Sequence, residues 1–111
     1  MAHYQIGKVS EDGYIPVLDG IERKTLVFGE NTLMAEFRLK KEKLIPAHKH
    51  PHEQTGYLVS GRIMLIIAGR EFEIRPGDSW SIPGDMEHGV RVLEDSIAVE
   101  VFAPVREDYL P

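Results

Sequence analysis

The sequence contains no cysteine, which excludes disulfide bonds, thiolate metal ligands and cysteine nucleophiles. Long apolar runs are also missing, since the strongly apolar stretch at residues 63–68 is far too short to cross a bilayer. The first residues have neither the basic start nor the apolar core of a secretory signal. Basic residues are outnumbered, and the net charge of −5 argues against nucleic acid or an anionic membrane as a partner. We therefore expect a cytoplasmic protein.

What is present suits one compact unit. The 111 residues, of which 42% are hydrophobic, suffice for one domain with an ordinary buried core and leave little room for a second. No low-complexity tract, Ser/Gly-rich linker or internal repeat interrupts the chain. The prediction is a single domain over residues 1–111.

Short segments rich in Val, Ile, Phe and Leu alternate with turn signals, and no window has the period of a long helix. In residues 32–40 the apolar residues occupy alternate positions, as in a half-buried strand. This pattern favours an all-β sandwich or barrel, whose mouth is a common place for a small-molecule site. The tail, residues 104–111, is expected to be an ordered extension that frays toward its end. Strands are predicted at 21–28, 32–40, 44–50, 56–60, 62–68, 71–74, 79–82, 90–93 and 97–102.

Three of the five histidines lie close together, at His48, His50 and His52. Side chains two apart on a strand point to the same side, so His48 and His50 can present two imidazoles to one ion. Gln54 and His88 are the best candidates for further ligands, because imidazole and amide oxygen suit several divalent transition metals. Incidental histidines in a solvated loop are the alternative, and an internal position argues against an affinity tag.

The neighbours of this cluster are assigned from strand parity. His52 has the parity to face inward, and a supporting or exposed position is expected for it. Glu53 has the opposite parity and is expected to point away.

The spacing of this cluster resembles the two motifs of the cupin family. The first cupin motif reads His-x-His, three or four residues, Glu, six residues, Gly, and His48, His50, Gln54 and Gly61 fit that spacing. The second contains Gly, five residues, Pro, four residues and His, which Gly77, Pro83 and His88 match. The resemblance implies a double-stranded β-helix, also called a jelly-roll barrel, that binds one metal ion through His48, His50, Gln54 and His88.

The chain departs from the cupin motifs at several positions. Gln54 replaces the usual Glu, and Asp85 and Glu42 stand where the motifs have Gly. Val92 stands where the second motif has Asn. The change at Gln54 leaves no anionic protein ligand, which is expected to weaken metal affinity and to sharpen Lewis acidity toward an anionic substrate. Nickel, zinc, manganese, iron and copper all remain compatible with three imidazoles and an amide.

A closer resemblance is carried by residues 50–57, His-Pro-His-Glu-Gln-Thr-Gly-Tyr, and by the tail at residues 101–108. Both look like the pectin-degradation cupins, which convert 4,5-unsaturated uronate monosaccharides into open-chain keto forms. In that family an Asp, a Phe and an Arg at these spacings are implicated in catalysis, and they correspond to Glu100, Phe102 and Arg106. The resemblance thus implies catalytic Glu100 and Arg106, substrate-binding Phe102 and Arg106, an anionic sugar as substrate, and a homodimer.

The residues themselves allow more than one interpretation. Both faces of strand 97–102 are largely apolar, so Glu100 needs a partner or a cavity, and a salt-bridged or rim carboxylate is the alternative to an acid–base group. Arg106 offers a planar fork for a carboxylate, or it pairs with Glu107 or Asp108 at the surface. Trp80 is expected in the core or at an interface.

Two other functions stay open from the sequence. Three imidazoles also suit a metal-dependent dioxygenase that uses iron or copper. A non-catalytic module that binds metal or sugar is the second alternative, since the barrel alone does not determine the chemistry.

Overall fold

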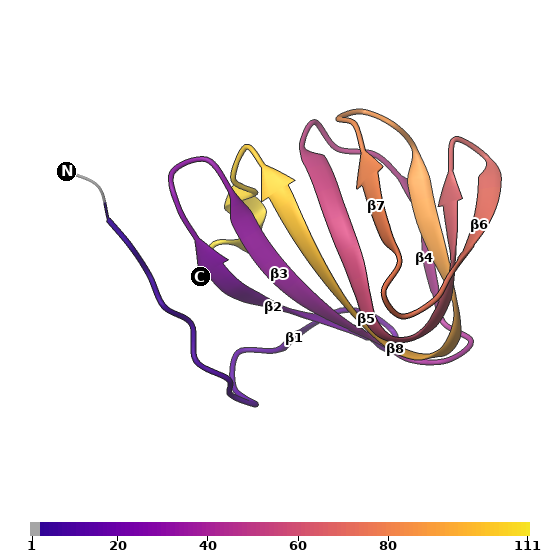
Figure 1. The fold of residues 1–111 in the computed structure, drawn as a ribbon, viewed down its shortest axis with the longest axis horizontal. Helices are drawn as coiled ribbons and strands as arrows, with labels where there is room; N and C mark the ends of the chain where they lie inside the picture. Colours follow the sequence, from indigo (N-terminus) through magenta and orange to yellow (C-terminus); the bar gives the residue numbers. More distant parts are fainter. Residues whose placement is uncertain (1–2) are drawn as a thin grey trace.

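The computed structural model describes residues 3–111, and its regular secondary structure is β-strand apart from one short 3-10 helix. The strands curl around a common interior, and residues 3–14 run outside them as an extended arm (Figure 1). No helix within the described range has the length and apolar character needed to span a membrane. The predicted all-β fold is confirmed. The elements are β1 (Ile15–Leu18), β2 (Ile21–Phe28), β3 (Leu33–Leu39), β4 (Leu44–His48), β5 (Glu53–Ile67), β6 (Arg70–Ile74), β7 (Ser79–Ile82), β8 (His88–Ala103) and the 3-10 helix η1 (Glu107–Tyr109).

Two long antiparallel strands, β5 and β8, organise the barrel. The first part of β8 pairs with β4 and with the second part of β5, which also pairs with β6. The second part of β8 pairs with β3 and with the first part of β5, which also pairs with β7. Each long strand therefore belongs to both halves of the barrel, and the strand order β1-β2-β3-β8-β5-β6 is that of a double-stranded β-helix.

The two long strands bend where Gly61 faces Ser96. Gly61 has a φ of +91°, and a Cβ added there would lie 2.1 Å from the Ser96 hydroxyl oxygen. That hydroxyl donates to the carbonyl of Glu94 at 2.7 Å and accepts from the Arg62 amide at 3.0 Å. Only glycine allows this close approach, so the bend depends on Gly61.

The predicted breaks at Gly61 and at residues 94–95 are wrong as strand ends. Pairing continues through both, with shifts of register between Leu58 and Ile63. The turn residues mark bulges in continuous strands, which bend a strand without ending it. The predicted strands at 56–60 and 62–68 are parts of β5, and those at 90–93 and 97–102 are parts of β8.

Three further differences lie near the barrel mouth. The predictions omitted β1, a short exposed edge strand that contains Pro16. The strand predicted to reach residue 50 ends at His48. The tail contains the short helix η1. Tyr109, the last residue of η1, packs against Phe102 with ring centroids 5.3 Å apart. The tail is thereby fixed to the barrel through an aromatic contact that strand periodicity does not encode.

The core lies between the two halves. In β3 buried and half-buried residues alternate along the strand, as the apolar pattern at residues 32–40 predicted. The core side chains leave a cavity of about 540 Å³ inside the barrel. The buried apolar residues are Ile21, Leu33, Ala35, Phe37, Leu39, Leu58, Ile63, Leu65, Ile74, Trp80, Ile82, Val90, Val92, Ala98 and Phe102.

Candidate metal centre

The cavity is lined by both apolar and polar side chains. Core side chains such as Ile63 and Leu65 form part of the lining. The lining also includes the exposed residues Pro46 and Ala47, so the cavity reaches the surface there. Every residue predicted to carry chemistry lines the same cavity, namely His48, His50, Gln54, His88, Glu100, Phe102 and Arg106.

Three imidazoles converge at one point of the cavity. The pairing of β4 with β8 places His48 opposite His88, and His50 follows two residues after His48. One ring nitrogen from each of the three lies within 4.8 Å of the other two. His48 is exposed, His50 is half-buried and His88 is buried, so the cluster runs from the rim into the barrel. The imidazoles could hold a metal ion.

Backbone carbonyls fix the tautomer of all three rings. Nδ1 of His48 lies 2.9 Å from the Pro46 carbonyl oxygen. Nδ1 of His50 lies 3.0 Å from the His52 carbonyl oxygen, and Nδ1 of His88 lies 2.8 Å from that of Met86. A carbonyl oxygen only accepts, so each Nδ1 donates its proton and each Nε2 keeps a free lone pair. The protein therefore presents three Nε2 atoms in the form that a cation requires.

Burial favours the neutral form of the inner two imidazoles. Desolvation lowers the pKa of His50, the positive charge of Arg106 and repulsion from a protonated His88 ring lower it further, and the nearby Gln54 acts in the opposite direction. Desolvation also lowers the pKa of His88, although its bond to the Met86 carbonyl opposes the change. Nε2 of His50 is buried and has no hydrogen-bond partner among residues 3–111. A buried acceptor without a donor is costly, and a cation would satisfy it.

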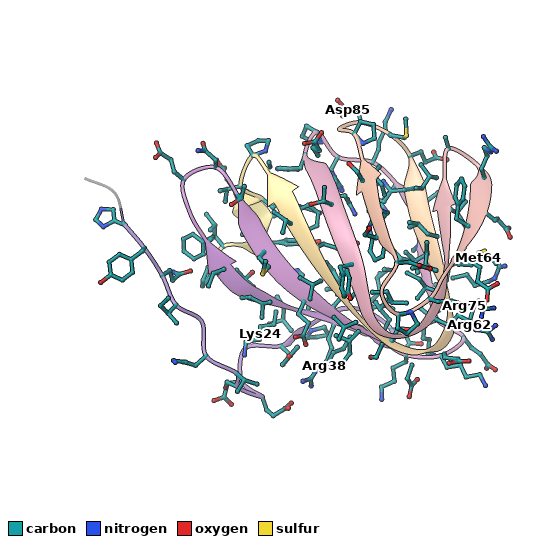
Figure 2. The ribbon with its side chains drawn as sticks, in the orientation of Figure 1. Lys24, Arg38, Arg62, Met64, Arg75 and Asp85 are labelled. Atoms are coloured by element: carbon teal, nitrogen blue, oxygen red, sulfur yellow. The ribbon has the colours of Figure 1, made fainter. Side chains whose placement is uncertain are left out.

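Two loops hold the cluster in place. The Asp85 amide donates to the His50 carbonyl at 2.7 Å, and Asp85 projects from the loop between β7 and β8 at one end of the barrel (Figure 2). A Cβ on Gly84 would lie 2.3 Å from the Pro51 carbonyl oxygen, so the loops approach to backbone contact. Asp85 has a φ of 63° and Glu42 a φ of 69°. Both departures from motif glycines therefore keep the left-handed backbone that glycine adopts most easily.

Gln54 connects the cluster to Glu100. The residue is 4% exposed, and its Nε2 donates to a Glu100 carboxyl oxygen at 2.5 Å. This bond directs the amide nitrogen toward the carboxyl, so that Oε1 points away from Glu100. Gln54 Oε1 is buried and has no partner within the described chain. It is thus a second unsatisfied acceptor beside His50, and the donor set fits a divalent cation.

Glu100 lies on the inner face of β8, where it lines the cavity. Desolvation raises the pKa of its carboxyl to about 7, although Trp80, Arg106 and Gln54 each act to lower it. The Trp80 indole N–H is buried and is not within hydrogen-bond geometry of the carboxyl in this arrangement. The carboxyl therefore changes between its protonated and ionised forms near neutral pH.

Gly56 makes room for Trp80 beside this carboxyl. Gly56 of β5 pairs with Trp80 on one side and with Glu100 on the other. A Cβ on Gly56 would lie only 2.1–2.3 Å from three atoms of the indole ring. Trp80 is 9% exposed and lines the cavity, so it belongs both to the core and to the site wall.

Arg106 is largely buried and is bound by its neighbours. Its Nη2 donates to Asp108 at 2.8 Å, its Nε donates to the other carboxylate oxygen at 3.2 Å, and its Nη1 donates to the Tyr109 hydroxyl at 3.1 Å. The guanidinium carbon lies 5.0 Å from the Phe102 ring centroid. The pairing with Asp108 and the cavity position occur together in this structure, although the sequence suggested them as alternatives.

The remaining predicted neighbours differ in exposure. His52 is half-buried, and its carbonyl orients the His50 ring. Glu53 is exposed, as its strand parity predicted.

Arg23 and Tyr109 also line the cavity, and the sequence reasoning missed both. Arg23 shares its face of β2 with the core residue Ile21, a parity signal that could have identified it. Tyr109 had no such signal, because it follows the last strand.

Comparison with known proteins agrees with this geometry. The cupin domain family model matches residues 35–104, which include the three histidines, Gln54 and Glu100. The chain belongs to the cupin family. Arg106 and Tyr109 follow the matched span, so the cupin model does not cover that part of the site wall.

This cupin is similar to two KdgF proteins and to a further solved cupin. It is 31% identical over 94 residues to the pectin degradation protein KdgF of Dickeya dadantii (strain 3937), covering 83% of this chain and 86% of the relative. The solved structure of KdgF from Halomonas sp. superposes with a TM-score of 0.92 at 27% identity, over 97% of this chain and all of that one. An RmlC-like cupin from Shewanella frigidimarina NCIMB 400 shares the fold, with a TM-score of 0.89, 24% identity and coverage of 99% and 100%.

Proposed function

We propose that this cupin is a metal-dependent enzyme that converts 4,5-unsaturated uronate monosaccharides into their open-chain keto forms. One observation carries the proposal: three imidazoles with free Nε2 atoms share a cavity with the carboxyl of Glu100, and Gln54 joins the two groups. Similarity to two KdgF proteins, one of them named for pectin degradation, supports the substrate class. The cavity of about 540 Å³ has room for a monosaccharide.

The proposed ligands of one divalent transition metal ion are Nε2 of His48, His50 and His88 and Oε1 of Gln54. When bound, such an ion supplies Lewis acidity toward a carboxylate or ring oxygen. None of the four ligands is anionic, so the donor set favours an anionic substrate. Nickel, zinc, manganese, iron and copper all suit these donors.

The reaction is an isomerisation in which protons balance. The proton of the C1 hydroxyl leaves, the C1–O5 bond breaks to give an aldehyde at C1, and a proton is added at C4 as the C5 enol becomes a ketone. Glu100 takes up the first proton and returns one to C4, so that no water, oxidant or co-substrate is consumed. The hydrogen bond from Gln54 fixes where the carboxyl of Glu100 lies. That control matters because Glu100 is one methylene longer than the Asp of the pectin-degradation pattern.

Phe102 and Arg106 act on the sugar, the first by contact and the second by its charge. Phe102 is 1% exposed and lines the cavity with its ring, which provides an apolar wall for one face of the substrate. Arg106 contributes a positive charge that acts on both Glu100 and His50. A positive charge at this position favours binding of the uronate anion and stabilises negative charge that develops on the opening ring.

The test follows the loss of absorbance of the unsaturated uronate after addition of the protein. Metal-loaded protein is expected to accelerate that loss, and protein treated with EDTA is not. Glu100→Gln is expected to lower the rate by at least about 100-fold, the usual contribution of a general acid–base group. His50→Ala is expected to lower the rate as EDTA does, because it removes a proposed metal ligand. The matched controls, His3→Ala in the N-terminal arm and Glu30→Gln in the β2–β3 turn, are expected to leave the rate unchanged.

Two results would contradict the proposal. Equal rates in the EDTA-treated and metal-loaded protein would exclude a metal-dependent reaction. Oxygen uptake with diketone or flavonol substrates, without any loss of uronate absorbance, would favour the dioxygenase alternative.

A further inference from the structure

The guanidinium of Arg106 already donates hydrogen bonds to neighbouring residues. Its Nε and Nη2, the two donors that form parallel bonds to a carboxylate, both bind Asp108, at 3.2 and 2.8 Å. Its Nη1 binds the Tyr109 hydroxyl. The side chain of Arg106 is 14% exposed, so little of it remains accessible. A ligand carboxylate that used this fork would have to displace Asp108.

Unlike Arg106, Arg23 has guanidinium donors that are not bound to a carboxylate. It lines the same cavity from β2, and its guanidinium carbon lies 3.9 Å from the Tyr109 ring centroid. Its hydrogen bond, from Nη2 to the Asp108 backbone carbonyl, measures 3.3 Å and involves no charged acceptor. Within residues 3–111 no carboxylate lies within 4.0 Å of its nitrogens. A half-buried cation without a counterion gains more from an anionic ligand than one that is already paired.

An aromatic wall joins Arg23 to the histidine cluster. Tyr109 contacts both guanidinium groups, with Arg106 4.0 Å and Arg23 3.9 Å from its ring centroid. The Tyr109 ring packs against Phe102 at 5.3 Å, and Phe102 packs against His50 at 5.8 Å. Phe102, Tyr109 and Arg23 therefore form a continuous wall of one cavity that begins at the histidine cluster, and a ligand in that cavity is exposed to the charge of Arg23.

We propose that Arg23 recognises the carboxylate of the ligand and thereby determines specificity for sugar acids over neutral sugars. The inference deepens the proposed function and rests on it for the choice of a uronate. Arg23 donates paired hydrogen bonds to the carboxylate. Asp108 keeps Arg106 in place, where Arg106 contributes charge without binding the carboxylate directly.

The test measures binding of two probes to the metal-loaded protein by calorimetry: glucuronate, a saturated and unreactive hexuronate, and its uncharged methyl ester. Wild-type protein is expected to prefer the acid. Arg23→Gln is expected to weaken binding of the acid by about 10–100-fold, the range for charge-assisted hydrogen bonds, and to leave the ester unchanged. Arg23→Lys keeps the charge and loses the fork, so an intermediate loss is expected, and this variant replaces Arg23→Gln should the latter fail to fold.

Arg38 provides the matched control. Its guanidinium also stacks on a tyrosine, 3.8 Å from the Tyr14 ring centroid, but it is paired with Glu11 and lies away from the Asp85 end of the barrel (Figure 2). Arg38→Gln is expected to leave the preference for the acid unchanged.

The outcomes separate the two proposals. If the Arg23→Gln protein still prefers the acid to the ester as strongly as wild type does, the role of Arg23 is refuted and the proposed reaction is unaffected. If wild type shows no preference, recognition of a carboxylate by Arg23 is refuted directly. If Arg23 governs the preference but no unsaturated uronate is converted, the inference holds and the proposed reaction fails.

Discussion

Replacing Gly56 with alanine tests how the wall beside Glu100 is built. The new Cβ would lie 2.1–2.3 Å from three indole atoms of Trp80, well inside van der Waals contact. Trp80 is 9% exposed and lines the cavity, so displacing it would disturb both the core packing and the cavity wall. Inserting a methyl group into a packed core typically costs about 1–3 kcal/mol. For a chain of this size, that cost corresponds to a fall in Tm of about 5–15 °C.

The assay compares thermal unfolding of Gly56→Ala with that of Gly29→Ala, because a Cβ on Gly29 meets nothing within 4 Å. Trp80 is the only tryptophan, so its fluorescence reports movement of the indole directly. We expect Gly56→Ala to lower Tm and to change the emission, and Gly29→Ala to do neither. Trp80→Phe should recover part of the loss in the Gly56→Ala background, because the smaller ring relieves the contact. Equal Tm values and identical emission spectra for the two alanine variants would refute the reasoning.

Three other predictions concern the site. In metal-free protein, Glu100→Gln should increase the stability at pH 8 by about 3 kcal/mol and have little effect at pH 4, because the carboxyl pKa of about 7 exceeds its ordinary value of 4.5. Below pH 4.5 the folded and unfolded states both hold the proton, between pH 4.5 and 7 the unfolded state ionises first, and above pH 7 the destabilisation by Glu100 is complete. Urea unfolding at pH 4 and pH 8, with Glu30→Gln as control, measures the change in stability. An equal gain in stability at both pH values would contradict the prediction. Gln54→Leu should weaken metal binding at least tenfold in competition with a chelator, since loss of even an outer ligand partner costs about 10–100-fold, and unchanged affinity would exclude Gln54 as a ligand. Phe102→Ala should lower the free energy of unfolding by about 3–5 kcal/mol, because the side chain is 1% exposed, whereas Phe72→Ala at a 42% exposed position should cost far less.

Much of this architecture follows from local patterns in the sequence. The alternation in residues 32–40 predicted the buried face of β3, and the turn signals located most of the strand boundaries. The histidines were predicted to meet across two strands, and their ring nitrogens lie within 4.8 Å of one another. Such features depend on side-chain period and spacing, which a sequence displays directly.

Other features depend on contacts between distant parts of the chain. Gly61 looked like a strand end because a glycine with positive φ serves equally well in a turn and in a bulge. The tautomer of each histidine depends on a backbone carbonyl that is not visible as a residue type. The inward position of Tyr109 depends on the tail folding back onto the barrel, where its carbonyl accepts from the Thr25 hydroxyl at 2.6 Å.

Strand β8 carries both a member of the histidine cluster, His88, and the carboxyl of Glu100. His88 begins this strand, and Glu100 and Phe102 lie near its end, all lining one cavity. One residue inserted between Ile97 and Glu100, beyond the bulge, would reverse the alternation and turn Glu100 and Phe102 outward while His88 stayed in place. Such a change within β8 would therefore separate the carboxyl of Glu100 from the histidine cluster while leaving the three imidazoles together.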